Sequence, residues 1–237
     1  SIAFSWSDSE PYQRGSFVGQ PFSWLEASYQ YTDVNNALYS LVEEFSGDQT
    51  YKDKSFDAKF LLFNETAILP AVAAGIRDMG GTGVFAAEYL VASKRIRNID
   101  FTLGLGWGSF SDHGFRNPLI DLDSSFAIRD VSDNETQGGE FTTGYWYSGK
   151  VGVFGGAEIF LPNFKGSRLK IEYDSTDYEL EGFPFGEESF NLAFDKVRQP
   201  SSKINLGLVY PLNDNLHLKL NYIKGHTISF GFSAQLN

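Results

Sequence analysis

Apolar and polar residues alternate with a period of two along most of this chain. The runs are roughly 9–12 residues long, which suits a tilted membrane strand better than the 5–6 residues of a typical globular strand. In the segment 101–108, for example, Phe101, Leu103 and Leu105 share one face, while Thr102 and Gly104 occupy the other. Similar runs lie at 168–174, 204–210, 216–222 and 228–233. This pattern predicts an all-β fold, a transmembrane antiparallel β-barrel.

The connections between the runs indicate how such a barrel is oriented. Segments 97–98, 162–167 and 213–215 are short, whereas 34–53, 111–141 and 177–202 are long and polar. Followed in strand order, the long segments all fall at one end, as in barrels with short periplasmic turns and long extracellular loops. Segments 1–9 and 12–20 leave the count at 10–12 strands, and we expect about 12 because bacterial barrels are usually even-numbered. The predicted location is the bacterial outer membrane.

Composition narrows the functional classes. The net charge of -11 argues against nucleic acid as a partner. The absence of cysteine excludes thiolate metal sites, catalytic cysteine and disulfides within the chain. Acidic segments 121–125 and 132–135 lack the full spacing of a calcium loop, and the adjacent residues 111–113 (Ser-Asp-His) cannot adopt triad geometry. We therefore expect no metal, no cofactor and no enzymatic activity, with an outer-membrane enzyme acting on lipid or glycan as an alternative.

The most distinctive segment, residues 73–95, reads AAGIRDMGGTGVFAAEYLVASKR. Its glycine cluster lacks the Gly-Lys-Ser/Thr ending of a phosphate loop, whereas tight turns need glycine because it adopts positive φ freely. The cluster is therefore predicted to be an external turn between two strands. The outward residues are predicted to be Val72, Ala74 and Ile76 before the turn and Phe85, Ala87, Tyr89 and Val91 after it.

Charged residues on the remaining face are the candidate ligand-binding residues. Either they form paired charges that stiffen the wall, or they form a polar track for a hydrophilic ligand. Many small residues also point inward, which leaves either an open lumen or space for a loop such as 111–141. The candidates facing the lumen or its rim are Arg77, Asp78, Glu88, Lys94, Glu158, Lys170 and Glu172.

Four segments resemble a known family: GQPFSWLEASYQYTD, DKSFDAKF, GIRDMGGTG with the following EYLVASK, and DFTLGLGWG. They are similar to the YjbH family of outer-membrane proteins, related to GfcD and associated with exopolysaccharide and capsule production. The resemblance implies a barrel for polysaccharide secretion or assembly, formed by residues 1–237 as a single domain or as one barrel of a longer protein. The implied partners are polysaccharide, outer-membrane lipid and lipopolysaccharide, and other exopolysaccharide secretion proteins.

The expected mechanism is passive, with a polar lumen or docking surface for the polymer. A plugged barrel that docks in a secretion complex is an alternative. The rival fold is a soluble β-sandwich or lipocalin-like binder, whose outward rows should be polar rather than apolar.

Overall fold

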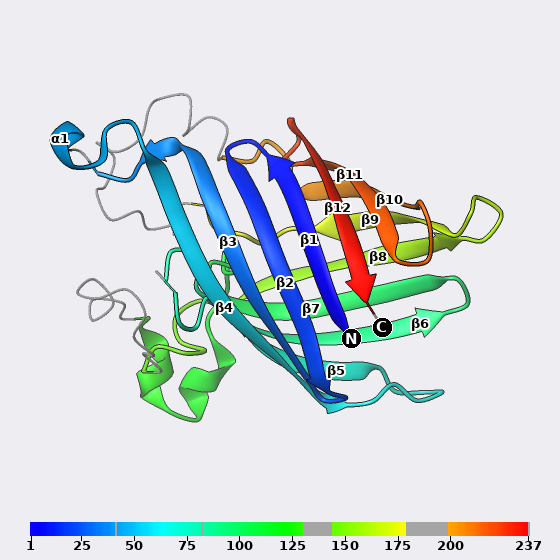
Figure 1. Cartoon of the computed structure of the whole chain (residues 1–237). Coiled ribbons are helices and arrows are strands. Elements are labelled where there is room, and N and C mark those ends of the chain that lie inside the picture. The colour runs from blue at the N-terminus through cyan, green and yellow to red at the C-terminus, as the bar shows by residue number, and fades with distance from the viewer. Residues whose placement is uncertain (41, 82, 130–143, 179–198, 237) are drawn as a thin grey trace.

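The computed structural model describes residues 1–40, 42–81, 83–129, 144–178 and 199–236. Strands β1 to β12 form one closed barrel in which every strand pairs antiparallel with its neighbours in sequence, and β1 closes on β12 (Figure 1). The predicted all-β barrel of about 12 strands is confirmed, and both N-terminal segments contribute strands.

The strands differ in length, and the helical elements are short. The strands are β1 (Ile2–Ser9), β2 (Tyr12–Phe22), β3 (Leu25–Leu38), β4 (Thr50–Phe63), β5 (Ala71–Arg77), β6 (Ala87–Ile96), β7 (Ile99–Gly108), β8 (Gly152–Leu161), β9 (Ser167–Tyr173), β10 (Ile204–Pro211), β11 (Leu216–Ile223) and β12 (Thr227–Leu236). The helical elements are α1 (Glu43–Ser46) and the 3-10 turns η1 (Pro118–Asp121) and η2 (Ser124–Ala127). Across the described residues, none of these helices has the length and hydrophobicity needed to cross a membrane.

Register shows which face of the wall each residue occupies, because directly opposed residues of antiparallel strands lie on the same face. Leu206 is opposite both Ile171 and Tyr222, and all three are more than 40% exposed. The neighbouring row on the other face, through Lys170, Gly207 and Asn221, is polar or small and lines the lumen. The apolar face therefore lies outside, which is the reverse of a soluble barrel-shaped binder.

The two ends of the barrel differ as predicted. One end, here called the short-turn end, carries the connections 97–98, 162–166 and 212–215 together with both termini (Figure 1). The other, here called the long-loop end, carries connections 39–49, 78–86, 109–151 and 174–203.

The predicted loop 34–53 is too long, because β3 and β4 continue to Leu38 and back from Thr50. Polar residues here extend the ladder instead of ending it. The Asp33 carboxylate, for instance, accepts a hydrogen bond from Lys52 at 2.6 Å.

Candidate functional site

Three aromatic side chains form a ledge on the inner wall. Tyr89 of β6 lies opposite Gly75 and Gly106, and Phe154 of β8 lies opposite Gly104. Phe110 follows β7, and its ring centroid lies 5.5 Å from that of Phe154 and 6.3 Å from that of Tyr89. Tyr89 and Phe154 are also 6.3 Å apart, in an edge-on arrangement. We call Tyr89, Phe110 and Phe154 the aromatic ledge.

The inward glycines exist because these rings lie directly on the backbone. A Cβ atom added to Gly75 would lie 2.2 Å from the Tyr89 ring, and one added to Gly104 would lie 2.2 Å from the Phe154 ring. Glycine within a strand commonly marks such a close approach. The prediction that the small inward residues leave open space is wrong at these positions, because aromatic rings fill it.

A cavity of about 620 Å³ adjoins the ledge along the inner faces of β6 to β9. Lys170 and Glu172 face inward yet remain exposed to solvent, so the lumen is hollow along this wall. Its lining combines one aromatic ring, hydroxyl groups and charges, including Ser93, Thr102, Phe154, Glu158, Lys170 and Glu172.

Ion pairs stiffen this wall. The Glu158 carboxylate accepts hydrogen bonds from Lys170 Nζ at 2.6 Å and from Arg168 Nη1 at 3.3 Å. Arg95 binds Asp100 through two bonds of 2.7 Å. The inward orientation predicted for Glu158, Lys170 and Glu172 is confirmed, and the cavity brings the three together.

Arg77 also faces the lumen, as predicted. It follows Gly75 on the inner face of β5, and its guanidinium carbon lies 5.1 Å from the centroid of the Phe110 ring. Arg77 therefore covers part of the aromatic ledge and adds a cation to it.

Asp78 anchors the loop 78–86 and does not line the cavity. Its backbone N–H donates to Asp57 Oδ1 at 2.9 Å, and its Oδ2 accepts from the Phe85 N–H at 3.1 Å. Asp78 adopts a φ of 52° and is only 3% exposed. Burial, together with the charges of Asp53 and Asp57, raises the pKa of the Asp78 carboxyl from 3.8 to about 7.

The loop that starts at Asp78 carries apolar residues into the mouth of the barrel. Val84 and Phe85 pack in a buried cluster, and the Phe85 ring meets Tyr12 edge-on at 5.8 Å. Glycine is required at Gly81, where a Cβ would lie 2.1 Å from the Lys54 carbonyl oxygen. The glycine cluster is thus more than a tight turn, and the prediction that Phe85 faces outward is wrong. The buried apolar cluster that Val84 and Phe85 join comprises Tyr12, Val34, Ala37, Tyr51, Val84 and Phe85.

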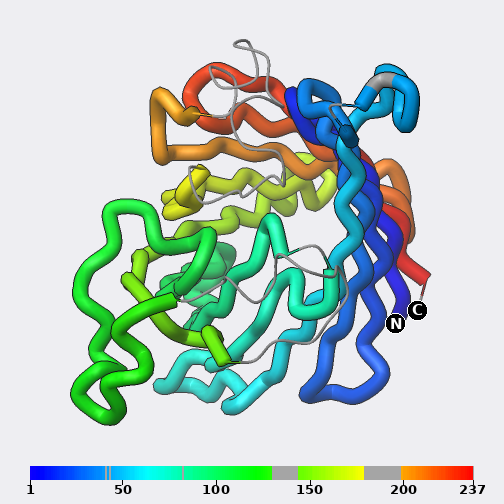
Figure 2. The backbone as a smooth tube through the Cα atoms, turned by 90° about the vertical axis from the view of Figure 1, so that its left-hand side faces the viewer, coloured from blue at the N-terminus to red at the C-terminus, as the bar shows by residue number. Residues whose placement is uncertain are grey.

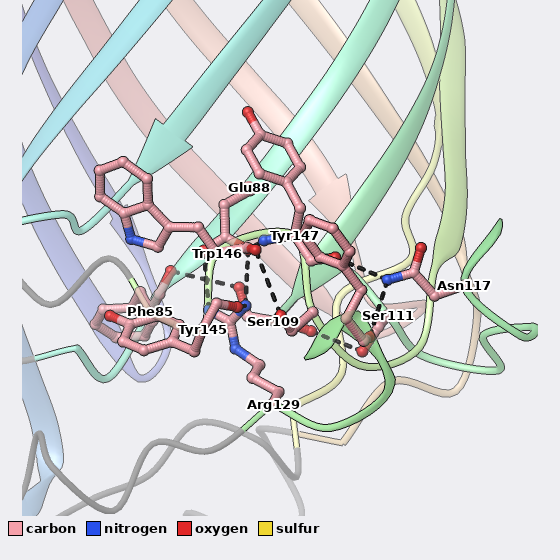
Figure 3. A network of polar contacts seen from close by, with 12 residues as sticks. Phe85, Glu88, Ser109, Ser111, Asn117, Arg129, Tyr145, Trp146 and Tyr147 are labelled. Carbon is pink, nitrogen blue, oxygen red and sulfur yellow. Dashed lines mark hydrogen bonds and ion pairs between the residues drawn. The ribbon is translucent and has the colours of Figure 1, made fainter. Parts of the chain in front are cut away.

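Glu88 does not face the lumen, which corrects the prediction. It lies opposite Ile76 and Trp107 on the outward face of β6, yet its side chain is only 1% exposed. Figure 3 shows the reason: both carboxylate oxygens accept from Arg129, at 2.7 and 3.0 Å, and Oε2 also accepts from the Tyr147 N–H at 2.9 Å.

These contacts hold the described parts of the 109–151 connection against the outside of the wall. We call residues 111–129 and 144–151 the outer lobe. Its Tyr147 ring packs edge-on against Trp107, with centroids 5.1 Å apart. In the view toward the long-loop end, residues 111–129 lie beside the ring of strands (Figure 2). The alternative that 111–141 folds inside the barrel therefore does not hold for its described residues.

The rest of the β6 prediction is inverted as well. Ala87, Tyr89 and Val91 share the inward face with Gly75, whereas Lys94 lies opposite Phe101 on the outward face. Lys94 still reaches the rim at the short-turn end, where its Nζ lies 3.0 Å from a Glu65 carboxylate oxygen and where both residues line the cavity. From Ala87 to Ala92 this strand is apolar on both faces except for Glu88, so the alternation of polar and apolar residues could not show which face is inward.

Several residues of the site were missed from the sequence. The signal that could have found the ledge is a row of inward glycines opposite aromatic positions, because a ring on a neighbouring strand fills the space above a glycine. Arg129 has no local signal, since its partner is 41 residues earlier. The missed residues are Tyr89, Phe110, Arg129, Phe154 and Arg168.

Comparison with known proteins identifies the family. The family described as "Exopolysaccharide biosynthesis protein YbjH" matches residues 1–237. The chain belongs to the YjbH family. The resemblance seen in the sequence is confirmed. The chain is 40% identical over 237 residues to a protein of Escherichia coli (strain K12) named "Uncharacterized lipoprotein YjbH". The alignment covers 100% of this chain and 32% of that protein. This family member thus spans about a third of that relative.

The solved structures with a similar fold include two porins and an outer membrane phospholipase. The KdgM porin aligns with a TM-score of 0.49 at 8% identity, covering 100% of this chain and 99% of the porin. The NanC porin aligns with a TM-score of 0.44 at 8% identity, covering 100% of both chains. The outer membrane phospholipase A of Escherichia coli aligns at 0.37 with 9% identity, covering 99% of this chain and 95% of the other.

Proposed function

We propose that this barrel resides in the bacterial outer membrane and offers its lumen to a polysaccharide, as a passage or a docking surface, without chemical turnover. The observation that carries the proposal is the aromatic ledge beside a hollow, charged cavity. The family description, which concerns exopolysaccharide biosynthesis, supports the same class of ligand.

The chemistry of the ledge suits a sugar. A pyranose ring has C–H faces that pack on aromatic rings and hydroxyl groups that bond to carboxylates and hydroxyls. Phe154 supplies such a ring within the cavity, and Glu158 and Thr102 supply acceptors and donors beside it. Because Glu158 is already paired with two cations, the polar wall is held in place before a ligand arrives.

The outward face supports the proposed placement in the membrane. The exposed apolar belt meets lipid, and Tyr173 and Tyr222, each 44% exposed, lie toward its long-loop margin. Tyr210 lies toward the other margin, where it packs on Phe164. Aromatic residues gather at both interfaces of such barrels, and the long loops face the cell exterior. Lipid and lipopolysaccharide are then the surroundings of the wall.

A second candidate is a plugged barrel that docks other secretion proteins. Val84 and Phe85 fill part of the mouth, where they pack against Tyr12. In that case the polymer would meet the rim of the barrel and would not cross its lumen.

Single-channel conductance of the refolded barrel in a planar bilayer separates the two candidates. Steady ohmic steps that neutral or charged oligosaccharides block support the passage. A silent barrel, shown to be folded by its heat-modifiable migration on gels, supports docking.

The ledge itself is tested by Phe154→Ala, with Leu103→Ala on the outward face as the matched control. We expect Phe154→Ala to weaken oligosaccharide binding about tenfold, a stacking contribution of about 1–1.5 kcal/mol, and Leu103→Ala to leave it unchanged. A folded barrel that neither conducts nor binds any oligosaccharide would refute the proposal.

A further inference from the structure

We infer that the polysaccharide accepted by this lumen is anionic, and that Arg168, Lys170 and Lys219 form the site that binds its carboxylates. The inference rests on the proposed function and adds the substrate class to it.

The three cations occupy one patch of the inner wall. Arg168 and Lys170 are two residues apart on the inward face of β9, and Lys219 lies on the inward face of β11. Val209 of the intervening strand β10 is opposite both Arg168 and Lys219. Gly207, opposite Lys170, adds no side chain of its own, and the neutral Asn221 amide lies in the space above it.

The charges in this patch do not balance. Arg168 and Lys170 share the Glu158 carboxylate, and Glu172, two residues from Lys170 on the same face, is the other carboxylate beside them, so three cations face two carboxylates. Lys219 makes no ion pair within the described parts of the chain, and the charges that act on it are those of Lys170 and Arg168. The whole chain carries a net charge of -11, so an excess of cations here is not a background property of the protein.

A like-charge group of this kind is unfavourable until an anion binds. A carboxylate entering the lumen would accept charge-assisted hydrogen bonds from Lys219 and Lys170 and relieve their repulsion. The low-dielectric walls of the barrel also focus the field of the cations into the lumen.

The same cavity holds the stacking surface. Lys170 and Phe154 both line the cavity of about 620 Å³, so one sugar can stack on the ring while its carboxylate reaches Lys170 at the edge of the cation patch. A neutral glycan would use the ledge and leave the excess cation unpaired. The pairing of an aromatic ledge with unbalanced cations therefore favours a uronate-containing polymer.

The test compares a short oligouronate with a neutral malto-oligosaccharide of equal length as blockers of the conducting barrel. We expect the oligouronate to block at a lower concentration and its block to weaken as salt is added. Lys219→Gln should raise the half-blocking concentration of the oligouronate about tenfold and leave that of the neutral sugar within about twofold.

Lys59→Gln is the matched control, because Lys59 is a lumen-facing cation on β4, on another part of the wall, and lies 3.9 Å from Glu26. Lys59→Gln should leave the half-blocking concentrations of both the oligouronate and the neutral sugar unchanged. If the barrel is silent, the same comparison is made by calorimetry on the folded protein in detergent, with the same expected ratios.

The outcomes separate the two proposals. Equal affinity for both sugars, or an oligouronate affinity unchanged by Lys219→Gln, would overturn the inference while the proposed function stands. Acetate that binds as tightly as the oligouronate at equal carboxylate concentration would reduce the patch to a small-anion site and overturn it too. If neither sugar binds, the proposed function itself fails.

Discussion

Replacing Arg129 by alanine will detach the outer lobe from the barrel wall while the barrel stays folded. Arg129 supplies two of the three hydrogen bonds that the Glu88 carboxylate receives from described residues. Glu88, with a side chain 1% exposed, then keeps the Tyr147 N–H as its one hydrogen-bond donor within the described part of the chain. Removing one partner of a buried ion pair costs about 3–5 kcal/mol, which corresponds to a rise of roughly 100-fold to several thousand-fold in the open population of the lobe.

The assay is limited trypsin proteolysis after Arg116, whose side chain is 61% exposed on the lobe. When opening and closing are fast, the cleavage rate follows the open population. We expect Arg129→Ala to accelerate this cleavage by at least about 100-fold, with unchanged heat-modifiable migration of the barrel. The double variant Glu88→Ala with Arg129→Ala should be cleaved more slowly than Arg129→Ala alone, because no buried charge is left unpaired.

A cleavage rate in Arg129→Ala equal to that of the unchanged protein would refute the claim that this ion pair holds the lobe. A double variant cleaved faster than either single variant would refute the claim that the unpaired charge is the main penalty. Glu88→Gln keeps the shape of the side chain. Its cleavage rate should lie between that of the unchanged protein and that of Arg129→Ala.

Two further predictions concern the loop 78–86 and the inward glycines. Because the pKa of Asp78 is raised from 3.8 to about 7, the folded protein holds this proton more tightly than the unfolded chain, so stability falls as the pH rises from about 4 through 7. The full difference is on the order of 4 kcal/mol, and Asp78→Asn should remove most of it. The measurement is the denaturation midpoint at pH 5 and pH 8, and an equal dependence in Asp78→Asn would refute the assignment. Gly104→Val places a Cβ 2.2 Å from the Phe154 ring and should cost about 1–3 kcal/mol, whereas Gly15→Val, with no atom within 4 Å of its Cβ, should be tolerated. Thermal unfolding compares the two, and equal midpoints would contradict the packing argument.

Much of the fold could be predicted because a barrel strand is a local pattern. Side chains alternate between lipid and lumen with a period of two, so rows such as Leu169 and Ile171 against Lys170 and Glu172 can be read without knowing the partner strand. The lengths of the runs and of the connections then predicted the strand number and the asymmetry of the two ends. The inward orientation of Arg77, Glu158, Lys170 and Glu172 followed from the same alternation.

Only the tertiary structure decided the faces of β6 and the course of the loops. Most of the strand is apolar on both faces, so the side of Tyr89 depends on Gly75, which lies opposite it and has no side chain. A lone carboxylate such as Glu88 indicates a polar lumen by local reasoning, yet its counterion Arg129 approaches from the outside of the wall. The physical reason is that alternation is a pattern of neighbouring residues in the sequence. Burial and charge pairing, in contrast, depend on residues far apart in the sequence that only the closed barrel brings together.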